Sequence, residues 1–464
     1  MDSRSNQPRS NLDRNLIVKF SQLKNIKVLV VGIIVTQSLV LAFYLRPMQD
    51  DYFNLQSVQQ LGLWGYLADT WQYHGGNMVQ FFIHCLLILP TTQNFVYWNF
   101  ASFFIVNQLM VFCVTRALLR WLFPIVKSSD LLFWIPLLSI AGFEGLFVPG
   151  FLGTFGFSLA TLAHLWPVMA VVIGLLGISK FRGSWLIALF LGLIAGNSNL
   201  GESAFAVSVC LFIFIAAKKV SNFEVRSNFR VDSNFYNFTF GALAGTIGIA
   251  AAPGFWVRAS DQVGLPNSLL EFGFRFMRSF ASFTADVLSH PMIWVLFLLG
   301  MILAKKNLLV LDEYFRFRVR ILCAGSILIW LSLIFGSTFA YPSWHQSMGM
   351  YVLLFPCVFG LGILAKWKFL IKNSNILMIL ASLVMAAIFL RIGVLGVDRG
   401  KIWDRNVTIN ACSLKADPAA ALLGAEIRYP PFGLGVEDVN TWKWMRDKYA
   451  GWLQRMPDQF NCGN

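Results

Sequence analysis

The sequence predicts an all-α protein, a polytopic transmembrane helical bundle, and three observations carry this prediction. Hydrophobic residues make up 57% of the chain and charged residues only 13%, whereas soluble proteins carry roughly a quarter charged residues. The hydrophobic residues gather in blocks of about 15 to 20, close to the length that crosses a bilayer. A backbone inside hydrocarbon must satisfy its own hydrogen bonds, which favours helices for these blocks.

Apolar blocks set the order of the expected helices. They are 28–45, 79–93, 97–115, 131–148, 164–179, 184–196, 202–217, 238–252, 292–304, 321–339, 350–365 and 375–396. The block 79–93 is interrupted by Pro90 and is the weakest, so we expect it to be interfacial or a half-crossing. The chain then has about 11 spans. The alternative is about 12 spans, in which case Arg116 and Arg120 break the rule that basic loops stay in the cytoplasm.

Basic residues at the ends of the blocks predict the orientation. The formal net charge is +14, and the Lys and Arg residues lie where they fix topology and meet anionic lipid headgroups. We therefore expect membrane lipid, and no nucleic acid, as the partner of this charge. The N-terminus is predicted to be cytoplasmic, the C-terminus extracytoplasmic, and the location the plasma (inner) membrane. The segments expected outside are 46–78, 149–163, 253–291, 340–349 and the tail from about 397.

These features divide the chain into a basic cytoplasmic leader, 1–27, a transmembrane domain, 28–396, with its first outer loop at 46–78, and an extracytoplasmic tail, 397–464. The tail is predicted to be a small folded appendage near the interface. Cys412 and Cys462 are the two cysteines of the tail. If the tail is extracytoplasmic, a disulfide between them is expected, because disulfides persist in oxidising compartments.

The outer stretch 253–290 alternates aromatic and polar residues and has a formal charge near zero. This pattern favours an amphipathic helix that lies on the outer leaflet. A simple solvated connector remains the alternative.

The strongest candidates for chemistry are Asp50 and Asp51, which lie a few residues beyond the first apolar block on the expected outer side. Carboxylates this close to hydrocarbon are costly and contribute little to orientation. Two adjacent carboxylates in a partly desolvated cleft repel each other, so one of them becomes a better proton acceptor and can serve as a general base. The alternative is that they cap the helix that begins at Tyr52.

Further polar residues of the expected outer side are candidates for binding. Aromatic residues between 64 and 74 suit the faces of sugar rings, although an aromatic belt at the interface gives the same pattern. Glu202 begins an apolar block, where an acid is costly unless it lines a polar cavity, but where a helix N-terminus also stabilises it. Arg258 can hold a phosphate through two hydrogen bonds, with headgroup contact as the alternative. His74 and His164 fit interfacial structure as well as a site.

Several short motifs occur in a fixed order along most of the chain. They are Asp50-Asp51-Tyr52, His164-Leu165-Trp166-Pro167, Gly196-Asn197-Ser198-Asn199 with Glu202, Ala252-Pro253-Gly254 followed by Arg258, Tyr341-Pro342, and Trp403-Asp404-Arg405. In this order they resemble the GT-C class of membrane glycosyltransferases. More closely, the chain resembles a bacterial group of glucosyltransferase-like membrane proteins.

The resemblance implies a GT-C-like fold and transfer of a sugar from a polyprenyl-phosphate-linked donor to a hydroxyl of a glycan, lipid or protein acceptor. The reaction would invert the anomeric centre and proceed either without a metal or with weak assistance from Mg²⁺ or Mn²⁺. Asp50 or Asp51 would act as the base. The expected substrate-binding residues are Tyr52, His74, Asn77, His164, Asn199, Glu202, Arg258, Tyr341 and His345.

The chain departs from this group at two places. Gly76-Asn77 stands where the group often has Gly-Arg, and Ser343-Trp344-His345 follows Tyr341-Pro342 where a basic residue is common. His345, Arg258 or Arg275 would then supply the positive charge for the donor phosphate.

Three other classes of function compete with sugar transfer. A flippase for lipid-linked oligosaccharide, or another transporter, would carry ionisable residues at mid-membrane and internal pseudo-symmetry. A surface-polysaccharide polymerase would favour basic outer loops. A non-enzymatic scaffold would tolerate replacement of Asp50 and Asp51.

Overall fold

The computed structural model describes residues 50–94, 98–124, 131–144, 161–177, 184–262, 266–305, 311–339, 344–365 and most of 401–454, together with isolated residues that include Cys462. The side chains of residues 50–53 lie outside the described part. The leader 1–27, most of the predicted block 28–45 and the whole block 375–396 also lie outside it.

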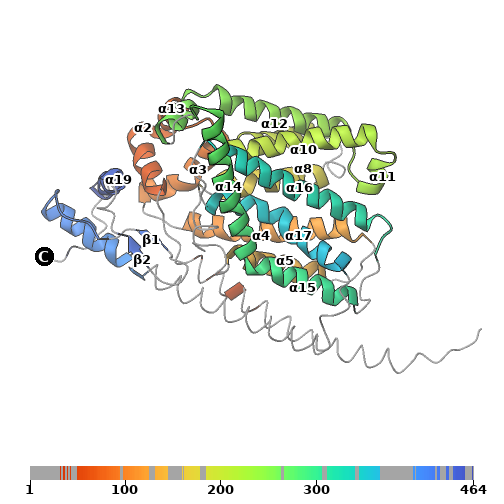
Figure 1. Cartoon of the computed structure of the whole chain (residues 1–464). Helices are drawn as coiled ribbons and strands as arrows, with labels where there is room; N and C mark the ends of the chain where they lie inside the picture. The colour runs from red at the N-terminus through yellow and green to blue at the C-terminus, as the bar shows by residue number, and fades with distance from the viewer. Residues whose placement is uncertain are drawn as a thin grey trace, which may run out of the picture.

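The described chain is a bundle of helices (Figure 1). In order these are α2 (Asp50–Tyr73), α3 (Met78–Asn94), α4 (Trp98–Leu122), α5 (Leu131–Glu144), η1 (Thr161–Leu165), α8 (Trp166–Gly177), α9 (Trp185–Gly196), α10 (Leu200–Lys219), α11 (Phe223–Ser227), α12 (Ser233–Ala251), α13 (Pro253–Gln262), α14 (Leu269–Ser289), α15 (Pro291–Lys305), α16 (Phe315–Gly336), η2 (Trp344–Ser347), α17 (Met348–Ala365) and α19 (Lys443–Gln454).

Four described helices, α4, α10, α16 and α17, are long and apolar enough to cross a membrane. The number rises to six if two bent pairs each count as one span, α12 with α13 at 57° and α14 with α15 at 52°. The predicted all-α class and membrane-protein composition are therefore confirmed. The total of about 11 spans stays a prediction, as does the crossing of 79–93, which forms the shorter helix α3.

Glycines bring the backbones of several helices into direct contact. Gly192 and Gly196 on α9 face Gly241 and Gly245 on α12, and a β-carbon at Gly196 would overlap the carbonyl oxygen of Ala242. Both helices thus carry two glycines four residues apart, the spacing that allows membrane helices to approach closely. Gly201 on α10 and Gly336 on α16 likewise allow the backbones of these two helices to approach closely.

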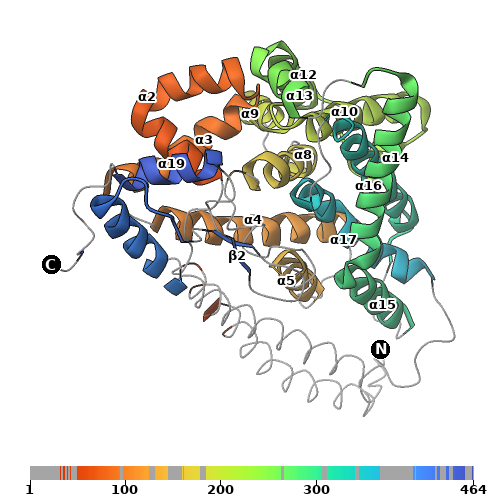
Figure 2. The same cartoon turned by 60° about the vertical axis from the view of Figure 1, so that its left-hand side comes forward.

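The segments that are predicted to lie outside gather at one end of the bundle. Helices α2, α13 and α19 lie at this end (Figures 1 and 2), and α11, in the basic loop between the blocks 202–217 and 238–252, lies at the opposite end (Figure 1). The arrangement agrees with the sidedness that the charges predict, while the orientation in a membrane stays a prediction. The expected first outer loop is largely helical, because α2 runs through it with a kink at Gly62, whose φ is 68°.

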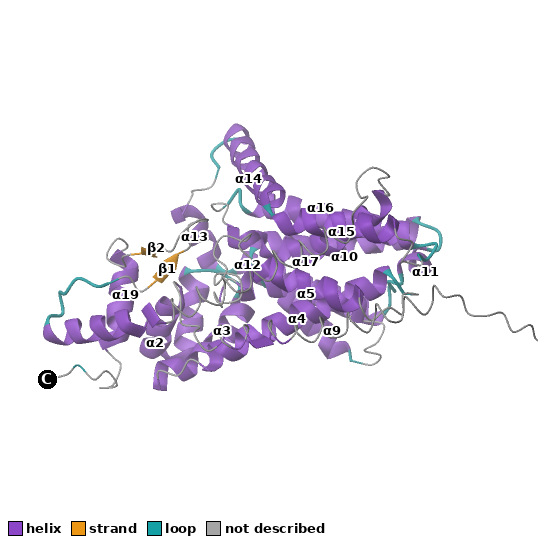
Figure 3. Cartoon of the chain, turned by 90° about the horizontal axis from the view of Figure 1, so that it is seen from below, coloured by secondary structure: helices purple, strands orange, loops and turns teal. Residues whose placement is uncertain are grey.

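Helix α14 runs across the bundle rather than along it (Figures 1 and 3). It begins at Ser268, whose hydroxyl accepts a hydrogen bond from the Glu271 amide at 3.1 Å. Leu270 and Phe274 are 72% and 70% exposed, whereas Phe283 is buried against the bundle. An exposed apolar face on a helix in this position agrees with the predicted amphipathic segment within 253–290.

The tail combines helix with a small hairpin. Residues 404–416 are helical, and the short strands β1 (Glu426–Arg428) and β2 (Gly435–Glu437) pair antiparallel. Cys412 and Cys462 form a disulfide with a Cα–Cα distance of 5.4 Å, as predicted. Tyr449 on α19 is fully buried and accepts a hydrogen bond from the Asn410 amide at 3.2 Å. Helix α19 packs against α2 (Figure 2).

Candidate active site

A cavity of about 120 Å³ opens among the helix ends that face the predicted outer side. Its lining comes from the α2–α3 turn, η1, the α9–α10 turn, α13, the end of α16 and η2. Six of the predicted substrate-binding residues contribute to it: His74, Asn77, His164, Asn199, Glu202 and Arg258. Residues that are far apart in the sequence thus meet around one space.

The other predicted site residues lie outside the described part of the chain. Asp50, Asp51 and Tyr52 form the first turn of α2, but their side chains are not among the described ones. Tyr341 and the side chain of His345 are likewise outside. Their predicted roles stay predictions.

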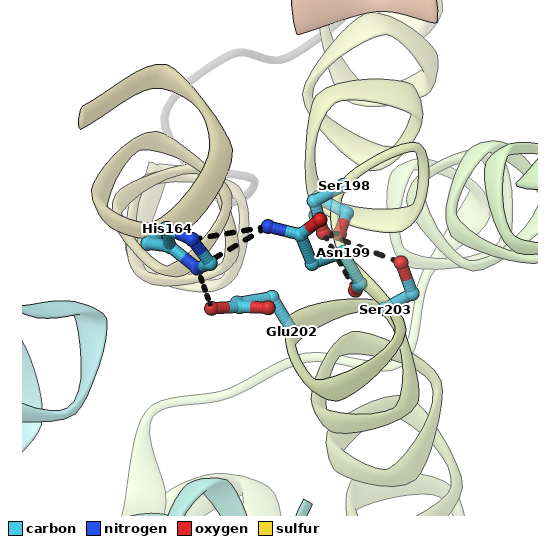
Figure 4. Close-up of polar contacts among 6 residues, drawn as sticks. His164, Ser198, Asn199, Glu202 and Ser203 are labelled. Carbon is cyan, nitrogen blue, oxygen red and sulfur yellow. Dashed lines mark hydrogen bonds and ion pairs between the residues drawn. The ribbon is translucent and has the colours of Figure 1, made fainter. Parts of the chain in front are cut away.

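His164 and Glu202 form the closest polar contact of the cavity (Figure 4). The imidazole Nδ1 lies 2.6 Å from the Glu202 Oε1, and the two residues are 5% and 2% exposed. The Asn199 amide nitrogen lies 3.3 Å from Nδ1 and 3.2 Å from Nε2 of the same ring. A carboxylate buried at this depth requires a partner, and the imidazole supplies it.

An unusual backbone turn carries His164. The segment Thr161–Leu165 forms a π-helical turn, and all of its residues are buried. Pro167 follows, and it lacks the amide hydrogen that a regular helix would donate to the carbonyl of Ala163. The wider turn accommodates this missing donor. The indole of Trp166 fixes the next position by donating to the Asn107 Oδ1 at 2.7 Å.

Asn197 joins the α9–α10 turn to the α2–α3 turn. Its side-chain oxygen accepts from the Val79 amide at 2.8 Å, and its nitrogen donates to the Gly76 carbonyl at 2.8 Å. Asn197 therefore has a structural role in holding the two turns together. Beside it, the Ser203 hydroxyl donates to the Gly196 carbonyl at 2.7 Å and lies 3.2 Å from the Ser198 hydroxyl (Figure 4).

Glycines also explain how the α2–α3 turn reaches the cavity. A β-carbon at Gly76 would lie 2.5 Å from the Ile249 Cα, and one at Gly254 would lie 2.5 Å from the His74 amide nitrogen. Larger residues at either position would push α12 or α13 away from the turn. The Gly76 and Pro253-Gly254 motifs thus place Asn77 and Arg258 on the same cavity.

Arg258 is an arginine that lines the cavity. It is exposed, and none of the described residues forms a hydrogen bond or ion pair with its guanidinium. Arg275, the other arginine considered for the donor phosphate, instead pairs with Glu271 and donates to the Thr338 carbonyl at 3.4 Å. The guanidinium of Arg258 is therefore the one that can meet an anion in the cavity.

Within the described ranges, no three His, Cys, Asp or Glu side chains come together as a metal-ion site. The use of Mg²⁺ or Mn²⁺ stays a prediction.

A second buried polar cluster lies between α2 and α3 and was not among the predicted site residues. The Asn54 amide nitrogen lies 3.2 Å from the His84 Nδ1, and the Tyr66 hydroxyl donates to the Asn54 oxygen. All three residues are buried. The signal that could have indicated this cluster is His84, an ionisable residue inside an apolar block. Gln346 and Ser337 also line the cavity unpredicted, although they flank the Tyr341-Pro342 motif.

The fold is an α-helical bundle with several helices long and apolar enough to span a membrane, and a polar cavity lies at one end of it. Compared with family models, curated proteins and solved structures, the chain shows no match. The resemblance to the GT-C class therefore rests on the residue motifs alone, and what it implies is a proposal.

Proposed function

We propose that the protein transfers a sugar from a polyprenyl-phosphate-linked donor to a hydroxyl of a glycan, lipid or protein acceptor on the extracytoplasmic face of the membrane, with inversion. The observation that carries this proposal is the meeting of a guanidinium, Arg258, with the buried His164–Glu202 pair around one cavity. An anion-binding group and a proton-handling group are the two functions that such a reaction needs.

The chemistry follows from these groups. The acceptor oxygen attacks the anomeric carbon, the bond from that carbon to the phosphate oxygen breaks, and its electron pair stays on the phosphate. Arg258 then stabilises the additional negative charge through charge-assisted hydrogen bonds. The acceptor hydroxyl must lose a proton. The resemblance assigns that proton to Asp50 or Asp51, and the described part of the cavity offers His164 as another acceptor.

The position of the cavity favours transfer over the main rival, a lipid-oligosaccharide flippase. A flippase needs polar groups along a path through the membrane. The ionisable residues of this cavity instead gather at helix ends, where a donor headgroup and an acceptor can meet. A surface-polysaccharide polymerase would use the same kind of lipid carrier. It differs from the proposed transferase in that it transfers sugar chains rather than single sugars.

The test is a transfer assay with purified protein in detergent and a panel of short-chain polyprenyl-phosphate hexoses. Arg258→Gln should lower transfer about 10- to 100-fold, the loss expected for one charge-assisted hydrogen bond or two. Arg278→Gln, which removes an exposed arginine on α14 outside the cavity lining, is the matched control and should stay near wild type. Asp50→Asn and Asp51→Asn run beside them.

Folding of every variant is checked by gel filtration and thermal unfolding. If the wild-type protein transfers sugar and Arg258→Gln and Arg278→Gln change the rate equally, the cavity is not the donor site. Lipid movement across vesicles without any sugar transfer would favour the flippase.

A further inference from the structure

The His164–Glu202 pair has the arrangement of an oriented proton acceptor. Because Glu202 Oε1 lies 2.6 Å from Nδ1, the proton of the neutral imidazole belongs on Nδ1, where it can be donated to the carboxylate. Nε2 is then the ring nitrogen that can take up a second proton. A carboxylate that holds an imidazole in this tautomer also stabilises the imidazolium that forms.

Asn199 supports the ring without replacing Glu202. One amide nitrogen lies 3.3 Å and 3.2 Å from the two ring nitrogens (Figure 4). It cannot lie along the in-plane direction of both, so it contacts the ring from the side and restricts its rotation. The closer partner of Nδ1 is Glu202, whose Oε1 lies at 2.6 Å against 3.3 Å for the Asn199 nitrogen.

The backbone conformation at His164 supports the same conclusion. Single π-helical turns are rare and occur frequently at functional sites, and here the turn Thr161–Leu165 carries the histidine. Gly349 on α17 allows close approach to this turn, because a β-carbon there would overlap the His164 carbonyl oxygen. Two helices and a buried carboxylate thus fix the position of one imidazole.

We propose that His164, positioned by Glu202, accepts the proton of the acceptor hydroxyl during sugar transfer. The proposal rests on the proposed function for its reaction class and names a base other than the one that the resemblance implies. The acceptor O–H bond breaks as its oxygen bonds to the anomeric carbon, and the proton moves to Nε2. The electron pair of the broken glycosyl bond leaves with the phosphate, and the imidazolium later returns its proton to water.

Titratable groups of the cavity and of the elements packed against η1 determine the controls. Among the described residues, His74 and Arg258 also line the cavity. The elements packed against η1 add further titratable side chains, which are His84 and Cys85 on α3 and Tyr351 and Cys357 on α17. His84 is as buried as His164 but is absent from the cavity lining, so His84→Gln is the matched control.

The kinetic test compares the pH dependence of kcat and kcat/KM in wild type and in five variants. His164→Gln should lower kcat by about 10²- to 10⁴-fold, the usual contribution of a general base, and should abolish the acid limb of the pH profile. Glu202→Gln should lower kcat less, because the ring loses the carboxylate that orients it but keeps its proton-accepting nitrogen. His84→Gln should leave the limb in place. An unchanged limb in His164→Gln, or its loss in Asp50→Asn or Asp51→Asn alone, overturns the proposal.

A second measurement does not depend on sugar transfer. Nitrogen NMR of ¹⁵N-histidine-labelled protein, with the His164 signal assigned by its loss in His164→Gln, reports the tautomer directly. The proposal requires the Nδ1–H form at high pH, reversible protonation at Nε2 on acidification, and a changed tautomer ratio in Glu202→Gln. An Nε2–H tautomer, or a ring that never protonates between about pH 5 and 8, sinks it. If the ring behaves as required but no donor supports transfer, the proposed function fails and the proton-accepting pair stands.

Discussion

Helices α9 and α12 are held together in the same way as α15 and α17, yet only the first pair ends at the cavity. In each pair glycines bring one helix against the carbonyl oxygens of the other, at Gly196 against Ala242 and at Gly362 against Phe297. The α15–α17 contact lies toward the end of α17 opposite Gly349 and is surrounded by apolar residues.

The two pairs differ in the residues that come after the glycines. After Gly196 the chain continues into Asn197, which bonds to Val79 and Gly76, and then into the cavity residues Asn199 and Glu202. After Gly362 the helix continues as apolar sequence to Ala365. Close glycine packing therefore sets the distance between helices in both places, and the polar turn at the helix end makes one of them a site.

Filling the glycine contacts should have the largest effect on the packing of the helix bundle. Gly196→Ala and Gly362→Ala should each destabilise the protein by about 1 to 3 kcal/mol, the cost of overpacking, and lower the thermal unfolding midpoint to a similar degree. Gly273→Ala on α14, where a β-carbon meets no atom within 4 Å, is the matched control and should keep or raise the midpoint. A wild-type midpoint for Gly196→Ala would show that the two helix pairs are not held together alike.

Asn197→Ala tests whether the polar turn after α9 is what makes the α9–α12 pair part of the site. Its loss removes the hydrogen bonds to Val79 and Gly76, at a cost of about 1 to 3 kcal/mol for the unsatisfied partners. Sugar transfer should fall about 10-fold or more in consequence. Ser139→Ala on α5 removes a buried hydroxyl that bonds only within its own helix at 2.9 Å, and its transfer should match wild type. Equal transfer in both variants would contradict the role of Asn197.

Removal of the tail disulfide should leave the cavity intact. No described residue of 401–454 lines the cavity. The disulfide spans a sequence separation of 50, and the entropy that it removes from the unfolded chain stabilises the folded tail by about 4 kcal/mol. The double variant Cys412→Ser, Cys462→Ser should exchange amide hydrogens faster in α19 and at an unchanged rate in α9 and α12. Transfer reduced as far as in Asn197→Ala would show that the tail supports the site.

The smallest expected effect concerns pH and the tail. Burial raises the pKa of Tyr449 above its ordinary value, with the Asn410 hydrogen bond opposing the shift. The folded tail thus keeps the phenol protonated where the unfolded tail ionises, near pH 10. Its contribution to stability is complete below about pH 10 and declines above it. Unfolding of the tail followed at pH 9 and pH 11 should show this decline in wild type and a weaker one in Tyr449→Phe.

Several features of the chain could be predicted from single residues. Glu202 at the start of an apolar block, Arg258 after Pro253-Gly254 and the tail cysteines each gave a local signal, and the structure places the first two on one cavity and joins the cysteines. The pairing of His164 with Glu202 could not be predicted. It depends on helix contacts made through glycines, and hydropathy records how apolar a helix is but not which neighbour it meets.

His84 shows the same limit from the other direction. It interrupts the otherwise apolar run 81–89, and its partner Asn54 belongs to a segment that was expected to be an outer loop. Only the folding of that segment into α2 beside α3 brings the two side chains together.

A cryo-electron microscopy structure of the full chain with a short-chain polyprenyl phosphate would decide whether the cavity is the donor site. We expect density for the phosphate in the cavity, within hydrogen-bonding reach of Arg258 and close to His164, with the isoprenoid chain leaving between helices. A phosphate bound elsewhere with the cavity empty, and the same position retained in Arg258→Gln, would refute the assignment of this cavity.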